Sequence, residues 1–167
     1  MEPRLIASEP TPRARTRLAA GDVFAIPLPD GSGHAFCRYL DKLLTEFFDL
    51  RSMDVPTIDE VVKAPVAFSV WVSKTALASW QKIGHISPPP RPSPLFFKQD
   101  SITRRLSLWD NGRESPADLA GCAGLECAAV WSAEHIVDRL QDHFAGRQNK
   151  WVESLAPKVG ADGRHRK

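Results

Sequence analysis

The sequence contains no apolar run that approaches the roughly 20 consecutive residues needed to cross a membrane. Its first thirty residues also lack the apolar stretch of a signal peptide and are instead rich in proline and arginine. We therefore expect a soluble protein that stays in the cytoplasm and has no membrane partner.

Cysteine is scarce. The chain has only Cys37, Cys122 and Cys127, and an odd number would leave one thiol unpaired in an oxidising compartment. This predicts a reducing cell interior. Four residues separate Cys122 from Cys127 and no histidine is nearby, which argues against a zinc site. We expect no metal and no cofactor.

Catalytic motifs are also missing. The sequence has no G-x-S-x-G elbow, no P-loop, no G-x-G-x-x-G after a strand and no H-E-x-x-H. Cys37 follows His34 by three residues in a predicted strand, so the two side chains point to opposite faces. His135 and His143 are eight residues apart on a predicted helix, too far to share a ligand. The sequence therefore predicts a protein that is not an enzyme.

The excess positive charge lies at the two ends of the chain. The formal net charge is +2, but residues 21–156 contain 14 basic and 17 acidic residues. A nucleic-acid-binding protein is expected to carry its basic surface on the folded body. Binding to nucleic acid is therefore not expected.

Length and composition indicate one domain. A chain of 167 residues, 43% of them hydrophobic, is long enough to bury a core without metals or disulfides. We predict a flexible leader at residues 1–20, a single domain at 21–156 and a disordered basic tail at 157–167.

Short strands dominate the expected domain. Alternation places Phe24, Ile26 and Leu28 on one face of the first strand, which forms a hairpin with the second. Asn111-Gly112 predicts a later tight hairpin, because both central positions of a type I′ turn need positive φ. The predicted strands span residues 21–28, 34–40, 46–50, 65–72, 96–100, 105–110 and 149–155.

One substantial helix is expected late in the chain. Ser132 is a good N-cap, Trp131 and Ile136 have the spacing of a hydrophobic staple, and Gly146 ends the helix. Shorter helices are predicted at 57–62 and 73–80, and the prolines of 87–94 predict an extended connector. The fold class is therefore α+β, with a mostly antiparallel sheet, strongly curved or closed into a small barrel, and one main C-terminal helix.

Tryptophan is unusually frequent: the chain has five, against a single tyrosine. Trp71 and Trp109 lie opposite the apolar faces of their predicted strands. Either the helix covers them or they belong to an exposed binding surface. We favour cover by the helix.

Several segments, taken in order, resemble the immunity protein 26 family: GDVFAIPLPDGSGHAFCRYL, FFDL, PVAFSVWV, IGHI, FFKQD, LWDNG, AAVWSAEHIVDRL and NKWVESL. The resemblance covers residues 21–155, and its most specific pieces are GDVFAIPL, FFKQD and LWDNG. Members of that family are bacterial proteins encoded beside polymorphic toxins. The resemblance implies a mostly β protein that binds and neutralises a cognate toxin without catalysis.

Candidate contact residues are the charged and aromatic side chains near turns in one stretch of the chain. They are Lys98, Asp100, Trp109, Asp110 and Glu114. Two rival functions are a small β-barrel-like module that binds nucleic acid or a small ligand, and an enzyme with converging polar groups in a pocket.

Overall fold

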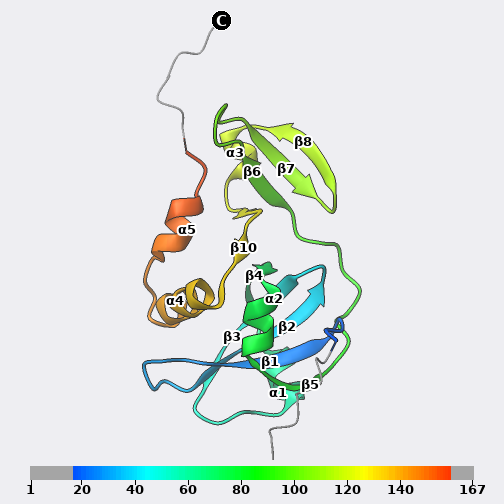
Figure 1. The fold of residues 1–167 in the computed structure, drawn as a ribbon, viewed down its shortest axis with the longest axis vertical. Helices are drawn as coiled ribbons and strands as arrows, with labels where there is room; N and C mark the ends of the chain where they lie inside the picture. Colours follow the sequence, from blue (N-terminus) through cyan, green and yellow to red (C-terminus); the bar gives the residue numbers. More distant parts are fainter. Residues whose placement is uncertain (1–16, 159–167) are drawn as a thin grey trace, which may run out of the picture.

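The computed structural model describes residues 17–158 as two β-sheets with helices packed against them (Figure 1). Most of the predicted leader (1–20) and tail (157–167) lies outside the described residues. The predicted α+β class is confirmed.

The large sheet has six strands in the order β10-β4-β3-β2-β1-β5. Strands β1 to β4 form an antiparallel meander, and β5 returns to pair with β1. Their bounds are β1 (Asp22–Pro27), β2 (His34–Asp41), β3 (Leu44–Ser52), β4 (Val66–Val72), β5 (Gln81–His85) and β10 (Val130–Trp131).

The small sheet has four strands in the order β8-β7-β6-β9 and lies beyond one end of the large sheet (Figure 1). Asn111 and Gly112 both have positive φ at the β7–β8 turn, which confirms the predicted hairpin. The bounds are β6 (Phe96–Gln99), β7 (Leu106–Asp110), β8 (Arg113–Ala117) and β9 (Glu126–Cys127).

Five helices complete the fold of residues 17–158, and each begins at a side chain that caps it. Ser132 accepts a hydrogen bond from the backbone N–H of His135, and Thr57 and Glu60 form a reciprocal capping box. The helices are α1 (Ile58–Lys63), α2 (Lys74–Ser79), α3 (Leu119–Cys122), α4 (Ala133–Phe144) and α5 (Lys150–Leu155).

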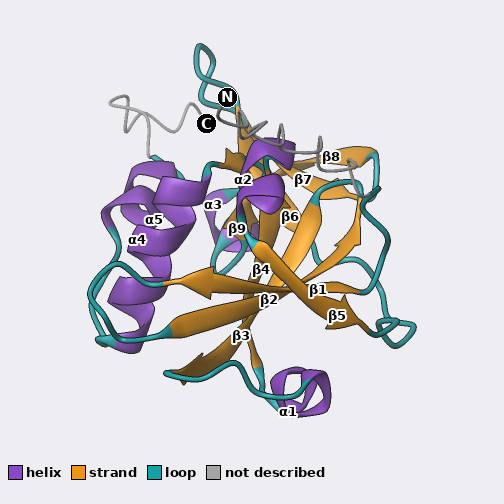
Figure 2. Ribbon diagram, turned by 60° about the horizontal axis from the view of Figure 1, so that its bottom comes forward, coloured by secondary structure: helices purple, strands orange, loops and turns teal. Residues whose placement is uncertain are grey.

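Both faces of the large sheet are buried. Phe24, Ile26 and Leu28 point into the main core, as predicted, and there they pack with residues of α2 and α4. Val23 and Ala25, on the opposite face of β1, belong to a second core beneath α1. Figure 2 shows α1 and α4 on different sides of the sheet.

The sheets are mostly antiparallel, as predicted. Of the two predicted shapes, a strongly curved sheet or a small barrel, the barrel does not form, because neither described sheet closes. The pairs β10–β4 and β6–β9 are parallel, and the sequence predicted neither pair. These parallel pairs involve only two residues of β9 or β10, which is too short for a recognisable alternation of apolar and polar residues.

The predicted strand at 149–155 is also wrong, because this segment forms α5. The Asn149 side chain accepts hydrogen bonds from the N–H groups of Trp151 at 3.1 Å and Val152 at 3.2 Å. An asparagine that satisfies these two free donors is a helix N-cap. Trp151 and Leu155 are four residues apart and both pack toward the core, a spacing that also fits a helix.

Strand β5 was not predicted, since QKIGH carries little strand signal. Its Gly84 lies directly beneath α1: a Cβ atom there would be 1.8 Å from Cδ1 of Ile58. Glycine at this position therefore lets α1 approach the edge of the sheet closely.

A buried carboxylate fixes the proline-rich connector. Glu46 in β3 is fully buried, and its Oε1 accepts a hydrogen bond from Nε of Arg38 in β2 at 2.7 Å. Its Oε2 pairs with Arg91, which lies within the 87–94 connector. The connector is therefore held by charge against the large sheet on its way from β5 to β6.

The side chain of Arg139 joins the main helix to both sheets. Its guanidinium lies 3.8 Å from the ring centre of Phe68 in β4 and 5.0 Å from that of Trp131 in β10. Both of its Nη atoms also donate to the carboxylate of Glu126 in β9. One buried cation thus contacts α4, the large sheet and the small sheet.

Replacing Arg139 with lysine should lower the free energy of unfolding by about 2 kcal/mol, because lysine keeps the charge but loses the forked pair with Glu126 and the stacking on Phe68. Arg147→Lys is the matched control. Arg147 is exposed and pairs with Asp142 at the surface, so its replacement should cost less than about 0.5 kcal/mol. Urea denaturation checks both values, and equal effects would contradict the role given to Arg139.

Asp22 ties the start of β1 to β5. Its buried carboxylate accepts hydrogen bonds from Lys82 at 2.6 Å and from the Ala19 N–H at 3.0 Å, and it lies 3.0 Å from Nδ1 of His85. Burial alone would raise the pKa of Asp22, but the hydrogen bonds from Lys82, His85 and Ala19 outweigh it and hold the pKa below its usual value.

The variant Asp22→Asn should therefore unfold more easily at pH 7, by about 2 kcal/mol, because the charged hydrogen bonds are lost. A depressed pKa in the folded state stabilises the protein above the ordinary Asp value of about 4, and this contribution disappears as the pH falls through the folded pKa. The difference between wild type and variant should shrink between pH 5 and pH 2. Denaturation curves across that range test it, and a constant difference would contradict the assignment.

Candidate functional site

The register of the small sheet gathers three of the five predicted contact residues on one face. Trp109 pairs with Glu114 across the β7–β8 hairpin, and Lys98 of β6 pairs with Ser107 of β7. Side chains opposite each other in adjacent strands share a face. Lys98, Trp109 and Glu114 therefore lie together with Ser107, and we call these four residues the polar–aromatic cluster.

Contacts within the polar–aromatic cluster are direct. The Lys98 ammonium lies 3.7 Å from the ring centre of Trp109 and 3.5 Å from Oε2 of Glu114. The Ser107 hydroxyl donates a 2.6 Å hydrogen bond to Oε1 of Glu114. That hydrogen bond, and secondly the charge of Lys98, hold the pKa of Glu114 below its usual value. The cluster is thus a partly exposed surface on which contacts within the protein fix the positions of the charged groups and the aromatic ring relative to one another.

Asp100 has a different role from that of the cluster. Its Oδ1 accepts hydrogen bonds from the N–H groups of Ile102 at 2.9 Å and Thr103 at 2.6 Å, and from the Thr103 hydroxyl at 3.0 Å. The bonds from Thr103 and then from Ile102 lower the pKa of Asp100. Asp100 therefore organises the turn between β6 and β7.

Asp110 is not brought together with the others. It occupies the last position of β7, where it pairs with Arg113. Because successive side chains of a strand alternate, the side chain of Asp110 points away from the face that carries Trp109.

Two hollows border the small sheet. One, of about 590 Å³, lies along β6 to β8; its lining includes Lys98, Asp100, Thr103, Arg105, Ser107 and Glu114. The other lies between the β2–β3 turn and the β7–β8 hairpin; its lining includes Asp41, Lys42, Trp71, Phe96, Trp109 and Asn111. Both open beside the polar–aromatic cluster.

The prediction that the main helix covers Trp71 and Trp109 is wrong. Trp71 stacks on Phe96 of the small sheet, with ring centres 4.1 Å apart and planes inclined at 28°. Phe96 in turn pairs with Trp109. The small sheet, rather than the helix, therefore covers Trp71, and Trp109 stays half-buried at the edge of this contact.

Sequence reasoning missed Ser107, which orients Glu114, and Gln99, which supports the turn. The side chain of Gln99 donates to the carbonyl of Arg104 at 3.1 Å. It also exchanges two hydrogen bonds of 2.8 Å with the backbone of Lys158. The Asn111-Gly112 turn sets the strand register, so the sequence did contain a signal for the residues that lie beside Trp109. No local signal indicated the contact between Gln99 and Lys158, which are 59 residues apart.

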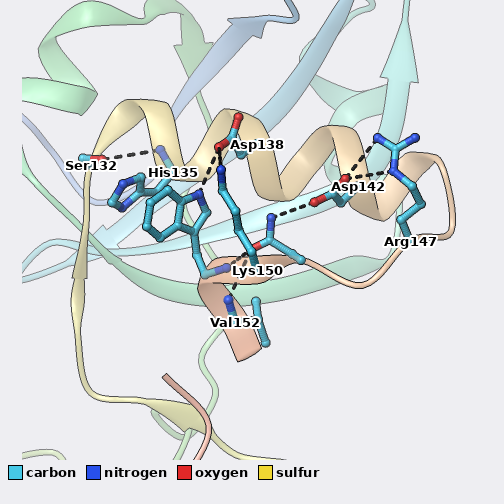
Figure 3. A network of polar contacts seen from close by, with 9 residues as sticks. Ser132, His135, Asp138, Asp142, Arg147, Lys150 and Val152 are labelled. Atoms are coloured by element: carbon cyan, nitrogen blue, oxygen red, sulfur yellow. Dashed lines mark hydrogen bonds and ion pairs between the residues drawn. The ribbon is translucent and has the colours of Figure 1, made fainter. Parts of the chain in front are cut away.

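A network of polar contacts joins α4 and α5 (Figure 3). Trp151 stacks on His135, with ring centres 3.6 Å apart, and its Nε1 donates to Asp138 at 3.0 Å. Asp142 accepts hydrogen bonds from Arg147 at 3.0 Å and from Asn149 at 2.9 Å. The network fixes α5 on α4, and the chain then reaches Lys158 beside Gln99. His135 is half-buried and stacks against Trp151.

The thiols are poorly suited to nucleophilic chemistry. Cys37 is fully buried, and burial raises the pKa of its thiol far above the usual value. Burial also raises the pKa of Cys122 and Cys127. Within residues 17–158, no group of three or more His, Cys, Asp or Glu side chains is placed to hold a metal ion. No helix in the same range is long and apolar enough to cross a membrane.

Residues 19–108 match the family model described as Immunity protein 26. The chain belongs to the immunity protein 26 family. The match covers more than half of the chain and ends within β7, so it is shorter than the 21–155 stretch over which the sequence resembles the family. Lys98 and Asp100 lie inside the matched region, whereas Trp109, Asp110 and Glu114 follow it. Comparison with curated proteins found no match, and neither did comparison with solved structures.

Replacing Asp100 with alanine should loosen the β6–β7 turn of this immunity protein 26 family member. The amides of Ile102 and Thr103 lose their acceptor and should exchange with deuterium several-fold faster. Asp110→Ala removes a carboxylate from the same sheet and should leave both rates unchanged. Hydrogen exchange followed by NMR measures them. Unchanged rates in Asp100→Ala would contradict the assigned role.

Proposed function

We propose that this protein neutralises a cognate bacterial toxin by binding it without catalysis, in the cytoplasm of the cell that makes the toxin. Membership of the immunity protein 26 family carries this proposal. Neutralisation needs only an occluding interface, and a standard interface buries about 800 Å² on each partner, which a chain of 167 residues offers.

The protein's chemistry agrees with this role. Its three cysteines are unpaired, as expected in a reducing interior, and burial raises the pKa of each thiol. The barrel on which the rival ligand-binding module depended is not present, since neither sheet closes.

We place the toxin-binding surface on the small sheet, centred on the polar–aromatic cluster. Trp109 is a half-exposed aromatic residue with a cation on its ring and a carboxylate beside it. Tryptophan and charged groups arranged in this way are typical of residues that dominate binding energy. Asp100 shapes the turn next to the cluster, whereas Asp110 stands at the tip of the β7–β8 hairpin with its side chain directed to the other face.

Growth protection tests the function. The polymorphic toxin encoded beside this chain should arrest growth when it is expressed alone in a bacterial host, and co-expression of this chain should restore growth. The purified pair should form a complex with nanomolar or tighter affinity. If growth is not restored and the purified proteins do not associate, the proposal is wrong.

The Trp109→Ala variant tests the location of the surface. It should weaken toxin binding at least ten-fold, because the ring is the largest contact group of the cluster. Val152→Ala removes an exposed apolar side chain from α5 and should leave affinity unchanged. Calorimetric titration of both variants, after circular dichroism shows that they are folded, makes the comparison. Equal affinities would remove the cluster from the interface.

A further inference from the structure

The most exposed large apolar side chain in the described structure belongs to Ile102, at 90% exposure. It stands at the turn between β6 and β7, at the end of the small sheet that faces away from the large sheet (Figure 1). At this exposure it makes almost no contact within the fold. Its size and shape therefore contribute little to folding, while a branched aliphatic side chain remains available to a partner.

Hydrogen bonds hold the backbone that presents Ile102. The carboxylate of Asp100 accepts from the N–H of Ile102 itself, as well as from Thr103. The N–H of Arg104 donates to the carbonyl of Asp100 at 3.0 Å, and the N–H of Asp100 donates to the carbonyl of Arg105 at 2.9 Å. A side chain on a fixed backbone loses less conformational entropy on binding than one on a flexible loop.

The turn also contains a strained residue. Arg104 has a φ of 60°, a left-handed conformation that costs a non-glycine residue about 1 kcal/mol. The hydrogen bond from Gln99 to the Arg104 carbonyl and the closure of the turn by Asp100 maintain it. The geometry at Ile102 is thus imposed by its surroundings.

The charges around Ile102 are mainly positive. Arg104 and Arg105 follow it and are exposed, and Lys158 is brought close by Gln99. Asp100 provides the opposing charge, and its carboxylate is already engaged with the turn. Opposite charges across an interface favour the encounter of two proteins. A partner for this turn is therefore expected to carry acidic groups around the site that receives Ile102.

We propose that Ile102 is the apolar anchor of the toxin-binding surface, and that it inserts into an apolar pocket with an acidic rim on the toxin. The inference rests on the proposed function and adds to it the residue and the chemistry of the complementary site. The hollow along β6 to β8 is lined both by Thr103, the neighbour of Ile102, and by Lys98, Ser107 and Glu114 of the polar–aromatic cluster, so the anchor adjoins a hollow that the cluster borders.

The test measures the affinity of three variants for the toxin encoded beside this chain. Ile102→Asp should raise Kd by roughly 30-fold, the loss typical of a central anchor. Ile102→Leu retains an aliphatic side chain and should stay within about three-fold of wild type. Met53→Asp places the same charge on another highly exposed apolar residue, in the loop before α1 at the far end of the molecule, and should not change Kd.

The outcomes separate the two proposals. If wild type binds and protects but Ile102→Asp changes Kd by less than about ten-fold, the anchor is wrong and the toxin-binding function stands. If wild type does not bind, both are wrong. Arg104→Glu tests the rim separately: it should slow association and weaken the salt dependence of the association rate, and an unchanged association rate would overturn the acidic rim.

Discussion

The arrangement of the two sheets depends on the contacts of a single guanidinium. Arg139 reaches from the main helix over Phe68 and Trp131 of the large sheet to the carboxylate of Glu126 in the small sheet. Among the described residues, neither hydrophobic core includes a residue of β6, β7, β8 or β9. The small sheet therefore takes its position from the large one, through this cation and through the stacking of Phe96 against the large sheet.

Two further contacts restrict the same arrangement from other directions. The proline-rich connector, which is stiff because proline fixes φ, is held where Arg91 meets the buried Glu46. At the other end of the chain, Lys158 bonds to Gln99 of β6 after α5 has packed on α4. These contacts are distant in sequence, and together with Arg139 they restrict the position of the small sheet. Its outer face can thus present side chains on a fixed frame.

Whether the sequence predicted a feature of the fold depends mainly on how far apart in the chain the residues that determine it lie. The Asn111-Gly112 hairpin and the capped helix after Ser132 were predicted, because turn and cap chemistry act within a few residues. The cluster of Lys98, Trp109 and Glu114 was predicted only as a group of residue types, since its geometry needs the register of three strands. The helix at 150–155 was missed although its N-cap, Asn149, directly precedes it. The two-residue strands and the partner of Trp71 were missed because each is decided by contacts far along the chain.

The large and small sheets contain different kinds of residue for a physical reason. In the large sheet, charged groups such as Glu46 are buried and paired, so a change there alters stability before it alters binding. At the outer end of the small sheet, Ile102 contributes little to folding, and on the same sheet Glu114 and Lys98 remain partly exposed. Side chains that the fold does not need can change to suit a partner without loss of the structure. The toxin-binding surface that we propose on the small sheet consists of side chains of this kind.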